Sequence, residues 1–211
     1  MRNLFGSLLL ALSLVAGFAH ALAAEPVAGT DYEVLKVAHP TSAPADKVEV
    51  IDFFWYGDPH CYKLEPTLEA FVKREGDRIL FKRVPVTLDE KCLFHTKLYY
   101  SLVQLGLEEK LMLAVYNEIQ KKTPMFSEEV QADFLATQGV DKRKFIDAYD
   151  SVTVMSLVEQ STKLSGDYRI STTPTLVVAG KYKTGPIYTK SYDGTATVLD
   201  YLVKQVQDKK L

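Results

Sequence analysis

The stretch FFWYGDPHCY, residues 53–62, joins the end of an apolar segment to the start of an amphipathic one. Residues 48–56 (VEVIDFFWY) are rich in β-branched and aromatic side chains, which predicts a buried strand. Apolar residues then recur at helical spacing after Cys61, which predicts a helix over about 59–75. Residues 79–86 (ILFKRVPV) predict the next strand, so this part of the chain indicates a parallel α/β sheet.

The middle of the chain is predicted to be helical. Leucines at positions 98, 102 and 105 form an apolar stripe that ends at Gly106. Ser127 and Asp141 are expected to cap two later helices, and a further helix is expected from Val154 until Gly166 stops it. These stripes predict a packed helical block rather than a cofactor site.

Strand signals return after the helical block. Residues 175–178 (TLVV) predict a strand, and residues 187–190 are expected to pair with it as an antiparallel hairpin after a turn at Gly180. Thr195 is expected to cap the last amphipathic helix, and a short strand is expected within 32–37. The sequence therefore predicts an α/β domain with helices inserted in its middle.

Composition excludes several classes of protein. The chain has 211 residues, of which 47% are hydrophobic and 25% charged, and its formal net charge is −2. These values argue against a disordered chain, a collagen-like chain and a polybasic nucleic-acid binder, so we expect no nucleic-acid partner. No stretch after the N-terminus is apolar over 18 residues, so we expect no transmembrane helix there.

The N-terminus has the pattern of a signal peptide. Arg2 is followed by an uncharged apolar run over 4–18 and by the small-x-small tripeptide Ala21-Leu22-Ala23. We therefore expect residues 1–23 to be cleaved and the mature chain to be exported to the periplasm. A membrane anchor is the alternative, but the run is short and polar sequence follows it. An oxidising compartment favours thiol pairing.

Three motifs resemble the DsbA type of thiol:disulfide interchange protein in the thioredoxin superfamily. Residues 53–62 are similar to that family's aromatic strand, Cys-Pro-His-Cys motif and helix start. Residues 171–182 (STTPTLVVAGKY) look like its cis-proline loop, strand and turn, and Pro66 like its helix-kinking proline. The resemblance implies a thioredoxin-like α/β fold with an inserted helical domain. The implied division is 24–86 and 166–211 for the two parts of the thioredoxin-like domain and 87–165 for the insertion.

Asp58 departs from the family's pattern, which has its nucleophilic cysteine at this position. A carboxylate cannot form a disulfide, so Asp58 and Cys61 cannot run the dithiol cycle. Asp followed by Pro59 is a favourable helix start, in which the carboxylate accepts a backbone hydrogen bond from His60 or Cys61 and adds about 1 kcal/mol. The alternative is a charge that tunes Cys61 or acts as a base, since a nearby anion raises the pKa of a thiol.

Cys61 has three interpretations. It is an inert buried thiol, or it pairs with Cys92, or it is a single thiol that forms mixed disulfides with substrates. A bond to Cys92 would close a loop of 30 intervening residues and add roughly 3 to 4 kcal/mol of stability. His60 is a candidate catalytic residue inherited with the motif.

The pairs His60-Cys61 and Cys92-x-x-His95 also supply enough ligands for a zinc or copper site. This metal-carrier hypothesis is the weakest one, and otherwise we expect no cofactor and no metal. His39 and His95 are expected to be ordinary structural residues.

Thr173 and Pro174 are candidate substrate-binding residues. A cis peptide bond before Pro174 would turn the backbone of Thr173 toward the helix start, where it could bind an extended peptide. The resemblance therefore implies exported proteins or peptides as substrates and raises a membrane redox partner as a further candidate. The main hypothesis is thiol:disulfide interchange through Cys61, and the alternative is a non-catalytic chaperone or adaptor.

Overall fold

The computed structural model describes residues 24–121, 123 and 125–210. The predicted signal peptide, residues 1–23, lies outside them. One five-stranded sheet has the order β1-β5-β4-β2-β3. The elements along the chain are β1 Glu33–Val34, β2 Val48–Phe54, α1 Pro59–Glu75, η1 Gly76–Arg78, β3 Ile79–Pro85, α2 Glu90–Leu105, α3 Glu108–Gln120, α4 Glu128–Thr137, α5 Lys142–Tyr149, α6 Val152–Asp167, β4 Thr175–Val178, β5 Tyr182–Thr184, α7 Pro186–Thr189 and α8 Tyr192–Gln207.

Strand β2 is the centre of the sheet. All seven of its residues are buried, as expected for a strand covered on both faces. It pairs in parallel with β3 and antiparallel with β4, so that Phe53 lies opposite Val84 on one side and Thr175 on the other. This register brings the start of α1, which follows β2, next to the loop that precedes β4.

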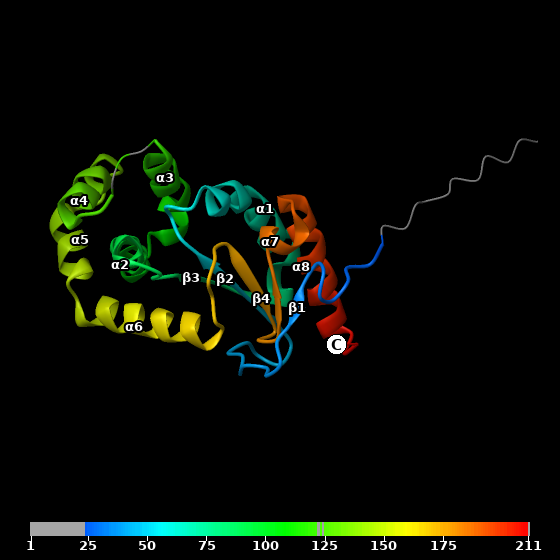
Figure 1. Ribbon diagram of the computed structural model, residues 1–211. Helices are drawn as coiled ribbons and strands as arrows, with labels where there is room; N and C mark the ends of the chain where they lie inside the picture. The colour runs from blue at the N-terminus through cyan, green and yellow to red at the C-terminus, as the bar shows by residue number, and fades with distance from the viewer. Residues whose placement is uncertain (1–23, 122, 124, 211) are drawn as a thin grey trace, which may run out of the picture.

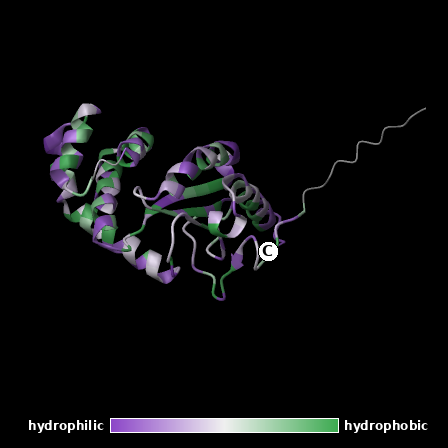
Figure 2. Ribbon diagram, turned by 45° about the horizontal axis from the view of Figure 1, so that its top comes forward, coloured by the Kyte–Doolittle hydropathy of each residue, from purple (hydrophilic) through white to green (hydrophobic). Residues whose placement is uncertain are grey.

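Helices cover both faces of the sheet. Helices α1 and α8 pack on one face, where Leu64, Leu68 and Leu202 are almost completely buried. Helices α2 to α6 form a separate block beside the sheet, between β3 and β4 in the sequence (Figure 1). The hydropathy colouring shows apolar strands inside and polar outer helix faces (Figure 2). No helix among the described residues is long and apolar enough to cross a membrane.

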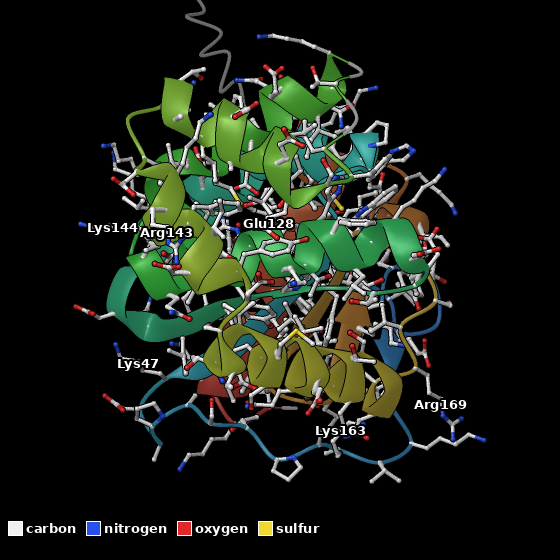
Figure 3. The ribbon with its side chains drawn as sticks, turned by 90° about the vertical axis from the view of Figure 1, so that its left-hand side faces the viewer. Lys47, Glu128, Arg143, Lys144, Lys163 and Arg169 are labelled. Atoms are coloured by element: carbon white, nitrogen blue, oxygen red, sulfur yellow. The ribbon has the colours of Figure 1, made fainter. Side chains whose placement is uncertain are left out.

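The helical block has its own core, which reaches the end of β2. Phe54, Tyr56 and Cys61 belong to this core together with residues of α2 and α3. Helices α2 and α6 run side by side, and Lys144, Lys163 and Arg169 point outward from this side of the molecule (Figure 3). The beginning of α1 is therefore held between the sheet and the helical block.

Most predicted elements are confirmed, including the caps at Ser127 and Asp141 and the helix end at Gly106. The predicted strand at residues 187–190 is wrong. The strand β5 comes earlier, and Pro186 begins the short helix α7, which has proline at its first position. Helix α8 is capped by Ser191 rather than by Thr195, which lies one turn inside it and is fully buried. Gly166 lies within α6 and does not end it.

Candidate functional site

Asp58 begins helix α1. Its backbone is extended, with φ −85° and ψ 116°, and its Oδ1 accepts a hydrogen bond of 2.7 Å from the backbone N–H of His60. Pro59 occupies the first helical position, where no backbone donor is needed. The predicted capping role is therefore confirmed, and the carboxylate is held over the positive end of the helix dipole.

The same carboxylate also binds the loop before β4. The Thr173 hydroxyl donates a hydrogen bond of 2.6 Å to Asp58 Oδ2, across 115 residues of sequence. The Thr173–Pro174 peptide bond is cis, and the loop is closed by a 2.8 Å hydrogen bond from Thr175 Oγ1 to the Thr172 carbonyl. The structure thus brings together the two motifs in which the sequence analysis placed its candidate residues.

Cys61 lies in the first turn of α1, with only 3% of its surface exposed. Burial raises the pKa of the Cys61 thiol well above its usual value, and the charge of Asp58 raises it further. The backbone of Trp55 and the hydroxyl of Thr173 oppose this shift without reversing it. Since the thiolate is the nucleophile in disulfide exchange, Cys61 at neutral pH is a weak one.

His60 is exposed and points to another element. Its Nδ1 lies 3.0 Å from the hydroxyl of Tyr192, at the start of α8. This contact joins the first turn of α1 to α8 at the surface.

Cys92 lies in the first turn of α2 and is buried. Its backbone N–H donates a hydrogen bond of 2.9 Å to Oδ1 of Asp89, the N-cap of that helix. Both Cys61 and Cys92 are free thiols in this structure.

His95 is an interior residue. Its ring stacks against the rings of Trp55 and Phe126, with centroid distances of 5.8 Å and 5.1 Å. Burial lowers the pKa of His95 to about 4. Within the described part of the chain, no three His, Cys, Asp or Glu side chains gather closely enough to hold a metal ion. The four residues of the metal-carrier hypothesis therefore do not form a site there.

Asp52, Glu65 and Arg83 form a buried charged cluster that was not predicted from the sequence. The Arg83 guanidinium forms an ion pair with Glu65, and burial raises the pKa of Asp52 to about 7, against the opposing charge of Arg83. The charge of Asp52 contributes to the raised pKa of Cys61, so the cluster acts on the site. Two acids, Glu49 and Asp52, within the otherwise apolar strand β2 were the signal that could have revealed buried charge there.

Gly57 is a second feature that the sequence analysis missed. A Cβ atom at this position would come within 2.2 Å of the Trp55 indole ring. Glycine therefore allows the turn before Asp58 to fold against Trp55.

Comparison with known proteins identifies the family. The thiol:disulfide interchange protein DsbA of Burkholderia cepacia is 58% identical over 212 residues, which cover 100% of both chains. The DsbA of Pseudomonas aeruginosa is 34% identical and covers 97% of each chain.

Solved structures agree with this assignment. The crystal structure of Pseudomonas aeruginosa DsbA superposes with a TM-score of 0.83 at 32% identity, covering 88% of this chain and 96% of that chain. The crystal structure of the oxidoreductase DsbA of Xylella fastidiosa superposes with a TM-score of 0.80 at 25% identity, covering 87% of this chain and 98% of that chain. No protein-family profile matches the chain. With its predicted thioredoxin-like fold confirmed, the chain belongs to the DsbA family of thiol:disulfide interchange proteins.

Proposed function

We propose that this chain is an exported, periplasmic DsbA-family protein with a degenerate site, in which Asp58 replaces the first cysteine of the family's motif. Thiol chemistry at the site is then limited to Cys61. The observation that carries the proposal is the position of the Asp58 carboxylate, which caps α1 and accepts the hydrogen bond from Thr173. It occupies the junction of the helix start and the cis-proline loop. Residues 1–23 are the proposed export signal, and a membrane redox partner is a further proposal.

The chemistry available to one thiol is exchange without net oxidation. The Cys61 thiolate attacks a substrate disulfide, the substrate S–S bond breaks, and a mixed disulfide forms as a substrate thiolate leaves. A second substrate thiolate then attacks the substrate sulfur of the mixed disulfide and releases Cys61. Electrons balance because one disulfide is consumed and another is formed. Oxidation of a dithiol substrate by an internal protein disulfide would need a second sulfur at position 58, and without it the oxidising equivalents must come from another disulfide.

Neighbouring residues have distinct proposed roles in this exchange. Asp52 is proposed as a charge that acts on the Cys61 thiol, because its carboxylate contributes to the raised pKa of Cys61. Thr173 and Pro174 are the proposed binding residues for an extended substrate segment. His60 is exposed at the rim, where it is available to contact that segment.

A second candidate function is peptide binding without catalysis. It is favoured by the 3% exposure of Cys61 and by the raised pKa of its thiol, both of which oppose nucleophilic attack. On this proposal the loop at Thr173 and Pro174 holds unfolded exported chains while Cys61 serves only as a packed side chain.

A trapping experiment separates the two functions. The mature protein is mixed with a peptide whose single cysteine carries a thionitrobenzoate group, and the product is identified by non-reducing mass spectrometry. Interchange predicts a peptide adduct at Cys61 that forms in the Cys92→Ser variant and disappears in Cys61→Ser. If no adduct forms while a cysteine-free version of the peptide still binds, the interchange function is excluded and the binding function remains.

A further inference from the structure

A groove of about 640 Å³ lies away from Asp58, along the free edge of the sheet. Its floor is β3, which is the last strand of the sheet and pairs with β2 only. One wall comes from the end of α1, and the other comes from α2, α6 and the first turn of α3. Figure 1 shows β3 on the side of the sheet that faces the helical block.

The walls of the groove are largely apolar and aromatic. Phe81 on the floor and Tyr99, Tyr100, Val103 and Leu157 on the helices line it. The Arg83 guanidinium lies 5.0 Å over the Phe81 ring. An extended chain on an edge strand directs alternate side chains toward such walls while its backbone pairs with the strand.

Two buried polar atoms at the groove have no partner among the described residues. They are Arg83 Nε, a donor, and Glu108 Oε2, an acceptor. Such atoms are costly to bury unless something satisfies them. An extended peptide in the groove can place a basic side chain against the Glu108 carboxylate, whereas a peptide carbonyl could reach Arg83 Nε only after the guanidinium shifts, because that atom is itself buried.

The charges of the groove favour a basic occupant. Lys82 is bound to Glu49 at 2.8 Å, and Arg83 is paired with Glu65, so both cations on the floor are neutralised within the protein. Glu108 and its neighbour Glu109 lie at the end of the groove, and Oε2 of Glu108 has no hydrogen-bond partner among the described residues. The groove therefore presents a net negative charge.

We propose that this groove, lined by β3 and the first turn of α3, is a second peptide-binding site. Its occupant is an extended, apolar segment of an unfolded polypeptide that carries one lysine or arginine. The segment adds a strand to the free edge of β3 and places its basic side chain against Glu108. The inference rests on the proposed function in so far as it assumes that unfolded chains are the ligands, but it concerns a different surface from the loop at Thr173 and Pro174.

The test uses a fluorescein-labelled, cysteine-free peptide of seven residues that alternates valine and threonine around a central arginine. Binding to the mature protein is measured by fluorescence anisotropy, and the protected amides are located by hydrogen exchange. The proposal predicts slower exchange in residues 79–85 when the peptide is bound. Replacing the arginine by glutamate should weaken binding at least fivefold, and methylating alternate backbone nitrogens of the peptide should weaken it at least tenfold.

A protein variant tests the acidic contact. Glu108→Gln should weaken binding about fivefold or more, because an ion pair in a partly desolvated groove is lost. Glu128→Gln is the matched control, since Glu128 is likewise the first residue of its helix, α4, and lies outside the groove. Thermal unfolding of both variants verifies that each is folded.

Three results would overturn the inference. They are equal binding of the arginine and glutamate peptides, an unchanged affinity in folded Glu108→Gln, and protection of residues 171–175 without protection of 79–85. The last result would leave the proposed function intact and locate the peptide at the cis-proline loop. The proposed function fails by a different result, in which no peptide adduct forms at Cys61 and residues 171–175 are not protected from hydrogen exchange.

Discussion

Replacing Asp58 by serine should make Cys61 more reactive. Serine keeps a side-chain acceptor for the His60 N–H, so the cap of α1 is retained, while the negative charge is removed. Asp58 is the second cause of the raised Cys61 pKa, after burial. The Asp58→Ser variant should therefore have a lower Cys61 pKa that still remains above its usual value.

The size of the effect follows from Coulomb's law. Side chains three residues apart at a helix start lie about 6 Å from each other, and a unit charge at that distance contributes about 1 to 3 kcal/mol at an effective dielectric constant of 20 to 40. This range corresponds to a fall of about one to two pKa units. Below the pKa, the thiolate fraction at fixed pH should rise roughly 10- to 100-fold, and the alkylation rate roughly 3- to 15-fold, because a thiolate of lower pKa is intrinsically less nucleophilic.

The assay is iodoacetamide alkylation across a pH series, with peptide mapping by mass spectrometry to follow each cysteine separately. Cys92 is the internal control, because Asp89 rather than Asp58 is the carboxylate at its helix start. The midpoint of the Cys61 rate profile should move to lower pH while that of Cys92 stays constant. An unchanged Cys61 midpoint in a folded Asp58→Ser protein would refute the electrostatic role assigned to Asp58.

Three further predictions concern stability. Gly57→Ala should lower the free energy of unfolding by about 1 to 3 kcal/mol in urea, because its Cβ would overlap the Trp55 ring; wild-type stability in this variant would contradict the packing described. Thr173→Val should lower the free energy of unfolding by about 1.5 to 3 kcal/mol, because it removes the hydroxyl that donates to Asp58 Oδ2. Thr172→Val, which leaves that hydrogen bond in place, is the control. His95 has a lowered folded-state pKa of about 4 against 6.5, so the unfolded chain binds more protons between these values. Stability should therefore fall by up to about 3 kcal/mol as pH drops from 6.5 to 4. His95→Phe should remove that part of the slope, and an unaltered slope would show that His95 does not cause it.

Local patterns predicted much of the fold. The unit of β2, α1 and β3 follows from the β-branched run and the helical spacing after Cys61, since both signals arise from burial of neighbouring side chains. The error at residues 187–190 has a local cause as well. Gly185 has φ 149° and lets the chain turn before Pro186 begins α7, and no hydrophobic pattern encodes that turn.

The site was predictable only in part. The cap at Asp58 depends on adjacent residues and was predicted correctly. The hydrogen bond from Thr173 joins positions 115 residues apart, and the stacking of His95 between Trp55 and Phe126 depends on tertiary packing. The same holds for the buried ion pair of Arg83 with Glu65. Contacts of this kind are decided by the register of the sheet and the position of the helical block, which the sequence pattern does not specify.

The most direct test is oxidation of a reduced peptide with two cysteines, followed by fluorescence, using the wild type and Asp58→Cys. Each protein is first oxidised with copper phenanthroline, which is then removed, so that no glutathione mixed disulfide at Cys61 can act as the oxidant. The account predicts that the wild type does not oxidise the peptide, because position 58 supplies no sulfur, whereas Asp58→Cys does so stoichiometrically. Stoichiometric oxidation by the wild type that is lost in Cys61→Ser would contradict it.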